Sequence, residues 1–160
     1  MSKSVELDSM DRRILGLMQD DVTLSIQQIG DQIGLSANPC WRRIKRLEAD
    51  GVIERRVALI DPVAVGLGMT AFVAIRTNQH NVDWLKRFAR GVQTIPEIVE
   101  CHRMSGDIDY LLKVVVSGIE HYDRVYQRLI AAVPGLSDVS STFSMERLKY
   151  GTKLDLTTAP

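Results

Sequence analysis

The spacing of apolar residues changes once along this chain, close to Gly51. Before that point, apolar residues recur every three or four positions, which is the spacing of one face of an α-helix. After it, short runs rich in β-branched residues are separated by two further stretches with helical spacing. These patterns predict an α+β protein, with an all-helical N-terminal part followed by a part that mixes strands and helices.

Three helices are expected before Gly51. Asp8 can cap the first helix, and Ser25 with Gln28 has the spacing of a capping box at the start of the second. Gly34 suits the end of the second helix, and the third helix begins only a few residues later. A helix, a tight turn containing Gly and another helix are the pattern of a helix-turn-helix.

Basic residues gather in the third expected helix and directly after it, although the chain as a whole has 20 basic and 20 acidic residues. Cys40, Ile44 and Leu47 have the spacing of the inner face of that helix, which leaves its polar side chains outside. Arg and Lys bind phosphates and guanine edges, and Asn can pair with adenine. We therefore expect this segment to bind double-stranded DNA. The expected contact residues are Ser36, Ala37, Asn38, Trp41, Arg42, Arg43, Lys45, Arg46, Arg55 and Arg56.

Position along the third helix predicts which residues reach the bases. In helix-turn-helix proteins, residues near the N-terminus of the recognition helix contact base edges, here Ala37, Asn38, Trp41 and Arg42. Arg46 lies one turn further on and is expected to contact a phosphate. A basic helix face that is merely solvated is one alternative. A nucleoid-type architectural protein that coats DNA without an effector is another, although the local confinement of charge favours specific sites.

Residues 52–62, VIERRVALIDP, alternate in polarity and predict a strand. We interpret this strand as a wing, from which Arg55 and Arg56 would hold the DNA backbone. Gly66 and Gly68 then indicate a linker. The expected domains are residues 1–60 for DNA binding, 61–68 for the linker and 69–160 for a second domain.

The second domain is expected to have the order β-α-β-β-α-β of a ferredoxin-like fold. In such a domain two helices cover one face of the sheet, and the other face lacks a cover. Within the first strand, Val73 and Ile75 lie on one face and Phe72 lies on the other, so neither face is polar enough for water. This predicts a homo-oligomer. The expected strands are residues 69–77, 97–104, 109–116 and 136–150, and the expected helices are residues 82–92 and 119–133.

Five motifs along the chain resemble, in order, the signatures of the Lrp/AsnC (feast/famine) family of regulators. They are LDSMDRRILGLMQDD, LSANPCWRRIKRLEADGVI, LIDPVAVGLG, MSGDIDYLLKVVV and VPGLSDVSSTF. The resemblance implies an N-terminal winged helix-turn-helix, a ferredoxin-like effector domain, dimers that pair through their sheets and often octamers. It also implies an amino-acid effector. The segment CWRRIKRLE most resembles the sequences of a subgroup tied to cysteine detoxification. This resemblance makes cysteine a candidate effector.

The segment around Gly106 has the chemistry to bind an amino acid. A turn containing Gly can expose N–H groups to the carboxylate, while Asp107 or Asp109 can bind the ammonium. The family motif Gly-Asp-x-Asp-Tyr implies an effector site between dimers at this turn, and Ile108 stands where the family often has Tyr. The alternative is a simple β-turn, in which Gly and Asp are common. The expected effector residues are Met104, Ser105, Gly106, Asp107, Ile108, Asp109, Tyr110, Ser140, Ser141 and Thr142.

No catalytic group, cofactor or metal is expected. The histidines are scattered and no C-x-x-C occurs, whereas a zinc site needs about four closely spaced ligands. Cys40 and Cys101 are expected to be free thiols. A small amino-acid-binding enzyme stays an alternative, but no nucleophile and base are paired in the sequence. No apolar run approaches the roughly 18 residues of a membrane span, so we expect a cytoplasmic protein without a membrane partner.

Overall fold

The structure, a computed structural model, describes residues 5–79 and 81–157 of the chain. It divides into two compact units, each with a hydrophobic core of its own. The first unit comprises Met1–Ala58 together with Lys149–Pro160, and the second comprises Leu59–Leu148. The chain therefore passes from one unit to the other twice.

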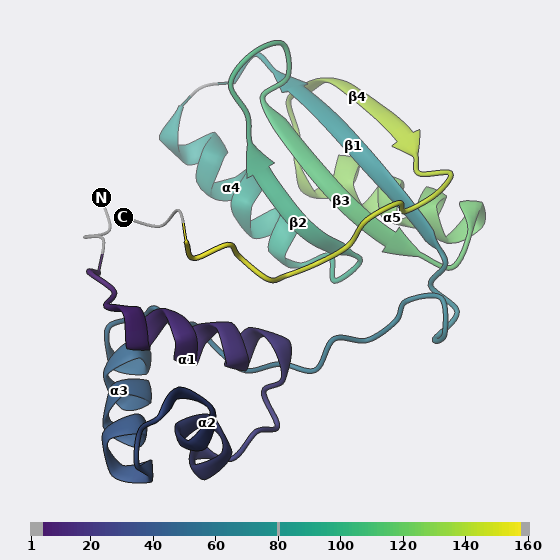
Figure 1. The fold of residues 1–160 in the computed structure, drawn as a ribbon. Helices are drawn as coiled ribbons and strands as arrows, with labels where there is room; N and C mark the ends of the chain where they lie inside the picture. The colour runs from purple at the N-terminus through teal and green to yellow at the C-terminus, as the bar shows by residue number, and fades with distance from the viewer. Residues whose placement is uncertain (1–4, 80, 158–160) are drawn as a thin grey trace. The chain divides into compact units, whose positions relative to one another are not determined.

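Three helices build the first unit, as expected (Figure 1). They are α1, Ser9–Asp20; α2, Ile26–Ile33; and α3, Ala37–Ala49. Their inner faces share one core, in which Ile14 of α1 and Ile44 of α3 are buried. Removing these apolar faces from water, at about 25 cal/mol per Å², is what holds three short helices together.

The predicted helix caps are confirmed. Asp8 caps α1 by accepting from the Asp11 N–H at 2.8 Å, and Asp11 in return accepts from the Asp8 N–H at 3.2 Å. At α2, Ser25 and Gln28 form the same reciprocal pair. Gly34 ends α2 in the left-handed conformation, with φ +76°. The sequence pattern therefore fixes where these helices begin and where α2 ends.

The turn between α2 and α3 is closed by a near contact of two backbone segments. A Cβ on Gly30 would lie 2.5 Å from the carbonyl oxygen of Leu35, a distance that real Cβ atoms do not reach. The Leu35 N–H also donates to the Gly30 carbonyl at 2.9 Å. Gly30 thus sets how closely the chain entering α3 follows α2.

The predicted strand over residues 52–62 is wrong. The structure forms no strand there, and the described residues of the first unit contain none, so no wing strands are present. Val57, Leu59 and Ile60 are all exposed in this segment. Its alternation is suitable for a strand, but a strand needs a neighbour for its backbone groups. The described chain provides no such neighbour at this position.

The C-terminal residues pack on α1, whereas we expected residues 69–160 to form one domain. Leu156 lies against the core of the first unit. Arg12 donates to the Leu156 carbonyl, and Gln19 bonds the backbone of Leu154. The last strand also ends earlier than predicted, at Phe143, because the chain then leaves the sheet for this unit.

The second unit has the expected βαββαβ order in one antiparallel sheet (Figure 1). Its strands lie side by side in the order β2-β3-β1-β4, which is that of a ferredoxin-like fold. The elements are β1, Met69–Thr77; α4, Val82–Gln93; β2, Ile98–Arg103; β3, Tyr110–Val116; α5, Ile119–Ala132; and β4, Leu136–Phe143.

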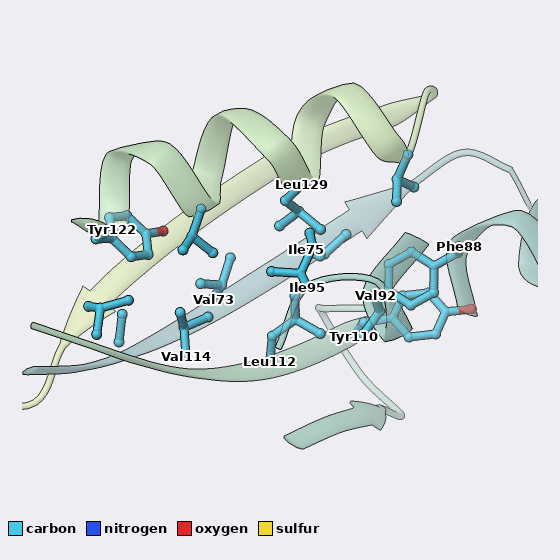
Figure 2. Close-up of a cluster of buried hydrophobic side chains, with 14 of the residues drawn as sticks. Val73, Ile75, Phe88, Val92, Ile95, Tyr110, Leu112, Val114, Tyr122 and Leu129 are labelled. Carbon is cyan, nitrogen blue, oxygen red and sulfur yellow. The ribbon is translucent and has the colours of Figure 1, made fainter. Parts of the chain in front are cut away.

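One face of this sheet is covered by α4 and α5 and forms the core of the second unit. Val73 and Ile75 of β1 are buried there as predicted, and Figure 2 shows Leu129 of α5 above them. Phe88 of α4 packs against Tyr110 of β3, with ring centroids 4.2 Å apart and the rings tilted by 35°. The two helices therefore pack on the alternate residues of each central strand.

The other face of the sheet is open in this chain. Phe72 of β1 is 40% exposed, and its partners across the ladders are Lys113 of β3 and Thr142 of β4. Leu111 and Val115 of β3 are half-buried beside it. We call the residues of β1, β3 and β4 on this side the open sheet face. Its apolar residues lie in β1 and β3, namely Phe72, Ala74, Leu111 and Val115, whereas Lys113 of β3 and Ser140 and Thr142 of β4 are polar.

Gly30→Ala should open the turn between α2 and α3, because the new Cβ has no space beside Leu35. We expect the first unit to lose about 1–3 kcal/mol, the usual cost of overpacking. The measurement is urea unfolding combined with hydrogen exchange of the α2 and α3 amides. The matched control is Gly16→Ala on α1, where a Cβ would meet nothing within 4 Å and should add about 1 kcal/mol of helix propensity. Equal effects of the two changes would contradict the role of Gly30.

Candidate DNA interface and effector turn

The outer face of α3 carries the residues predicted to contact bases. Asn38, Trp41 and Arg42 are exposed near its N-terminus. Trp41 is 47% exposed, so it does not belong to the core. Ser36 is the N-cap residue, but its side chain makes no capping bond, and Ala37 is half-buried. The first turns of α3 thus present an amide, an indole and a guanidinium to solvent.

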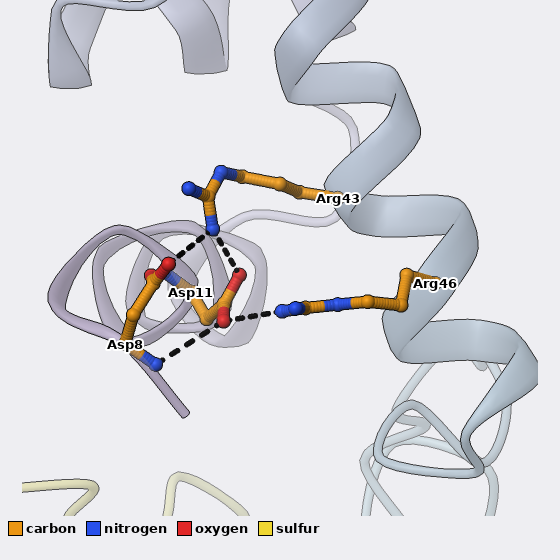
Figure 3. Close-up of polar contacts among 4 residues, drawn as sticks. All are labelled: Asp8, Asp11, Arg43 and Arg46. Atoms are coloured by element: carbon orange, nitrogen blue, oxygen red, sulfur yellow. Dashed lines mark hydrogen bonds and ion pairs between the residues drawn. The ribbon is translucent and has the colours of Figure 1, made fainter. Parts of the chain in front are cut away.

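A buried carboxylate ties α3 to α1 (Figure 3). Asp11 is fully buried, and its Oδ1 accepts from Arg43 at 2.9 Å. Its Oδ2 accepts from Arg46 and from the backbone N–H of Asp8. Arg43 also pairs with the Asp8 carboxylate at 2.5 Å. A buried charge is tolerated only when it is paired and hydrogen-bonded in this way, so these bonds fix α3 against α1.

The charges in this cluster are mutually stabilised. The pKa of Asp8 is lowered because its carboxylate accepts from the Asp11 N–H and from Arg43, which together outweigh partial desolvation. The pKa of Arg43 is raised by its hydrogen bonds to Asp8 and Asp11. Asp8 and Arg43 therefore stay charged at neutral pH.

Asp11 was not among the predicted site residues. Its position three residues after Asp8 is that of the second member of a capping box, which is the only local signal for it. Its bonds to Arg43 and Arg46 join residues far apart in the sequence. No periodic sequence pattern predicts ion pairs between residues so far apart in the chain.

The remaining basic residues differ in how far they are neutralised. Lys45 and Arg56 both donate to Glu48, at 2.8 and 2.7 Å. Arg55 lies 3.9 Å from the neighbouring glutamate and is well exposed. Arg42 has no hydrogen bond or ion pair with any residue that the structure describes. Among the predicted DNA contacts on α3, Arg42 is the basic residue with all of its donors available.

Three of the predicted arginines lie around one hollow. Arg42, Arg43 and Arg46 line it together with Pro39 and Asp8. Arg55 and Arg56 follow α3 in the chain and are exposed, but they do not line this hollow. The hollow combines three guanidinium groups with one carboxylate, so its charge is positive. An anionic group is the ligand that such a surface favours.

The predicted effector turn joins β2 to β3 and is fastened to the end of β1. The Met104 N–H donates to the Asp109 carbonyl at 2.8 Å, and the Asp109 N–H donates to the Ile75 carbonyl at 2.9 Å. The Asp109 carboxylate accepts from the Thr77 N–H at 2.8 Å. Gly106 has φ +118°, which favours glycine. Asp109 therefore holds the turn in place with its backbone and its side chain.

The residues of this turn divide between core and surface. Tyr110 is buried against Phe88 and belongs to the core of the second unit. The Asp107 carbonyl accepts from Arg76 at 2.7 Å, whereas its carboxylate has no hydrogen-bond partner among the described residues. Asp107 is thus the acidic group that the turn offers to a ligand. Exposed in the turn are Met104, Ser105, Gly106 and Asp107, and half-buried are Ile108 and Asp109.

The three candidate residues of β4 do not share a face. Ser141 pairs with Val73 in the ladder, and its hydroxyl bonds the Tyr122 hydroxyl on the helix-covered side. Ser140 and Thr142 lie on the open sheet face. In the sheet order, β3 and β1 separate β2 from β4. Within one chain, the serines and the threonine are therefore not gathered at the turn.

Two family models match this chain. One, described as the Lrp/AsnC ligand binding domain, matches residues 70–154. The other, described as winged helix-turn-helix DNA-binding, matches residues 7–54. The chain belongs to the Lrp/AsnC family. The resemblance expected from the five motifs is thereby confirmed, and the proteins of this family are transcription regulators rather than enzymes.

Lrp/AsnC proteins align with almost the whole chain. It is 48% identical to the DNA-binding transcriptional activator DecR of Escherichia coli (strain K12), over 94% of this chain and 99% of DecR. An AsnC family transcriptional regulator from Agrobacterium tumefaciens has 52% identity and a TM-score of 0.92, over 96% of this chain and 100% of that one. The regulator NMB0573 from Neisseria meningitidis, solved as an L-Met complex, has 30% identity and a TM-score of 0.88, over 94% and 97%. These likenesses confirm the α+β fold class.

The thiols and possible metal ligands add no further chemistry at these sites. Cys40 is buried and Cys101 is exposed, and both are free. Desolvation raises the pKa of each thiol, which disfavours the reactive thiolate. Residues 5–79 and 81–157 contain no group of three or more side chains placed to hold a metal ion. In the same ranges, no helix is long and apolar enough to cross a membrane.

Proposed function

We propose that this Lrp/AsnC protein is a transcription regulator that binds specific double-stranded DNA sites through α3 and responds to a free amino acid. The observation that carries the proposal is the first part of α3, where Asn38, Trp41 and Arg42 point outward with their polar groups available. The helix that bears them is held against α1 by the buried Asp11. A rigid helix with unengaged donors suits the reading of base edges. The regulator would act in the cytoplasm.

Within this proposal the arginines of α3 have different roles. Arg42 contacts a base or phosphate with its full set of donors. Arg43 and Arg46 first hold α3 in place, since both donate to Asp11. A guanidinium has five N–H groups, and Arg46 is half exposed, so its remaining donors are available to a phosphate. Arg55 and Arg56 contact the backbone from the segment after α3.

The effector is proposed to bind at the exposed part of the β2–β3 turn. Its ammonium would meet the Asp107 carboxylate, and its carboxylate would meet N–H groups near Gly106, where a side chain does not block approach. Ser140 and Thr142 would join this site only from a second copy. The L-Met complex of NMB0573 supports an amino acid as the ligand class, and cysteine remains our candidate from the sequence wording.

We further propose that the open sheet face pairs with the same face of a second chain. Phe72, Leu111 and Val115 are apolar and incompletely covered there. A face of this kind is usually buried in a partner. Such dimers would assemble further, with an octamer as the expected size for this family.

Arg42→Ala should weaken binding to specific DNA without changing stability, because Arg42 bonds to no described residue. We expect a loss of about 1–3 kcal/mol on a duplex selected from a random pool and an unchanged melting temperature. Arg46→Ala should weaken all sequences nearly equally and reduce the salt slope by about one. It should also lower the melting temperature, because a buried oxygen of Asp11 loses a partner.

Fluorescence anisotropy at several salt concentrations measures the DNA affinities, and scanning fluorimetry measures stability. Arg87→Ala, which removes an exposed arginine of α4, is the matched control. If Arg42→Ala binds the selected duplex with wild-type affinity, α3 is not the recognition helix. Equal wild-type affinity for selected and random duplexes would favour the architectural alternative.

An amino-acid effector should raise the melting temperature of the wild-type chain. A ligand that binds only the folded state adds about 2.7 kcal/mol at a hundredfold excess over its dissociation constant. We expect one or a few of the twenty amino acids to produce a shift, and Asp107→Ala to abolish it. Asp123→Ala removes an exposed carboxylate of α5 that, among the described residues, accepts a side-chain hydrogen bond only from Gln127, so it should keep the shift. Asp109→Ala is unsuitable, because that carboxylate holds the turn.

A shift with L-cysteine would support both the turn and the cysteine candidate. A shift with another amino acid would keep the turn and discard cysteine. Thermal shifts that persist in Asp107→Ala would place the site elsewhere. If none of the twenty amino acids changes either the melting temperature or the DNA affinity, the effector part of the proposal fails.

The dimer proposal is tested by charging the open sheet face. Phe72→Glu should produce a monomer in sedimentation velocity, because it replaces an apolar side chain with a carboxylate that must lose its water on pairing. Lys113, across the ladder, is already paired with Glu100. Leu85→Glu is the matched control, since Leu85 is 37% exposed and Phe72 40% exposed, but Leu85 lies on α4. A wild-type chain that sediments as a monomer, or a Phe72→Glu variant that stays oligomeric, would rule out pairing through this face.

A further inference from the structure

Where the chain returns from the second unit to the first, its last described residues pack along α1. After β4, residues 144–157 form no helix or strand. The chain enters the first unit at Lys149 and then lies along α1. We call residues 144–157 the C-terminal strap. Its two ends are each held by hydrogen bonds to a different unit.

The distal end of the strap recognises α1 through both backbone and side chains. The Gln19 carboxamide accepts from the Leu154 N–H at 2.7 Å and donates to the Leu154 carbonyl at 3.2 Å. Arg12 donates to the Leu156 carbonyl, about two turns nearer the start of α1 than Gln19. The strap therefore runs antiparallel to α1, and these side chains satisfy its backbone groups as a neighbouring strand would.

Apolar packing also contributes to this docking. Leu156 is half-buried against the core of the first unit. Lys153 pairs with Asp20 at 2.6 Å, but both side chains are more than half exposed, and such pairs contribute little. Gln19, Arg12 and Leu156 therefore all contribute to docking.

The proximal end of the strap is fixed to the start of β1. The Ser144 N–H donates to the Thr70 carbonyl at 2.9 Å, which continues the pairing of β4 with β1. The residues between Ser144 and Lys153 lie in no regular element. At about 3.5 Å per residue when extended, they set an upper limit on the distance between β1 and α1. Asp11, the residue next to Arg12 on α1, holds α3.

We propose that the C-terminal strap is the route by which the effector unit acts on the DNA-binding unit. A change in how the second unit is held by its partners pulls or releases the strap, and α1 transmits this to α3 through Asp11. The inference rests on the proposed amino-acid response. The competing view is that residues 153–157 only complete the core of the first unit. The two views differ in whether the length of the strap matters.

The decisive variant is an insertion of about six Gly and Ser residues between Leu148 and Lys149, which adds roughly 20 Å of reach. Docking contacts stay intact, so hydrogen exchange of the α1 amides should match that of the wild type. The second variant is Gln19→Ala, which removes both bonds to Leu154 and should speed that exchange about threefold or more. The matched control is Gln27→Ala on α2, whose side chain bonds only Asp31 in the part of the chain that the structure describes.

The functional readout is the ratio of DNA dissociation constants with and without the amino acid that most raises the wild-type melting temperature. Allosteric coupling typically changes affinity by about 5- to 150-fold. We expect this ratio to fall below about 2-fold in the insertion variant and in Gln19→Ala. Gln27→Ala should keep the wild-type ratio. A full wild-type ratio in the insertion variant would overturn the strap as a route. Unchanged α1 exchange in Gln19→Ala would overturn the docking itself.

Failure of the proposed function looks different from failure of the strap. If none of the twenty amino acids changes the DNA dissociation constant of the wild-type chain, the amino-acid response is absent and the inference about the strap fails with it. If the wild type responds and the insertion variant responds equally, only the strap is wrong. The insertion variant decides the question even if Gln19→Ala does not fold.

Discussion

The DNA-binding unit depends on one buried carboxylate. Asp11 is enclosed completely, yet each of its oxygens has donors from Arg43, Arg46 or the Asp8 backbone. Leaving such a charge without partners costs several kcal/mol, so α3 can pack on α1 only where both arginines reach Asp11. The same bonds that satisfy the carboxylate therefore determine where α3 presents its outer face.

This arrangement explains how a neutral chain can bind a polyanion selectively. Arg43 and Arg46 are largely balanced by Asp8 and Asp11, and Lys45 and Arg56 share Glu48. The number of uncompensated charges near α3 is small, so the salt-dependent, sequence-independent part of DNA affinity is limited. Discrimination would then come from exposed groups such as Arg42. A nucleoid-type protein that coats DNA would instead need many uncompensated basic residues.

Local patterns predicted more of the fold than of the sites. The capping pairs at Asp8 and Ser25, and the alternation in β1, act over a few residues, and the elements they predict are present. Residues 52–62 have strand composition without a ladder partner, which composition cannot show. Tyr110, predicted as an effector residue, packs against Phe88 in an aromatic core, a contact that its local sequence does not show. Asp11 and the C-terminal strap involve contacts more than thirty residues apart, which no periodicity encodes.

The effector turn and the C-terminal strap are attached to opposite ends of β1. Asp109 fastens the turn to Thr77 at the end of β1, while Ser144 fastens the strap to Thr70 at its start. A ligand changes an equilibrium only if it binds one arrangement better than another. β1 is central in the sheet and paired on both sides, so it is unsuited to bending. A ligand at the turn would therefore act by moving the sheet as a rigid body relative to its partners, and the strap would move with it.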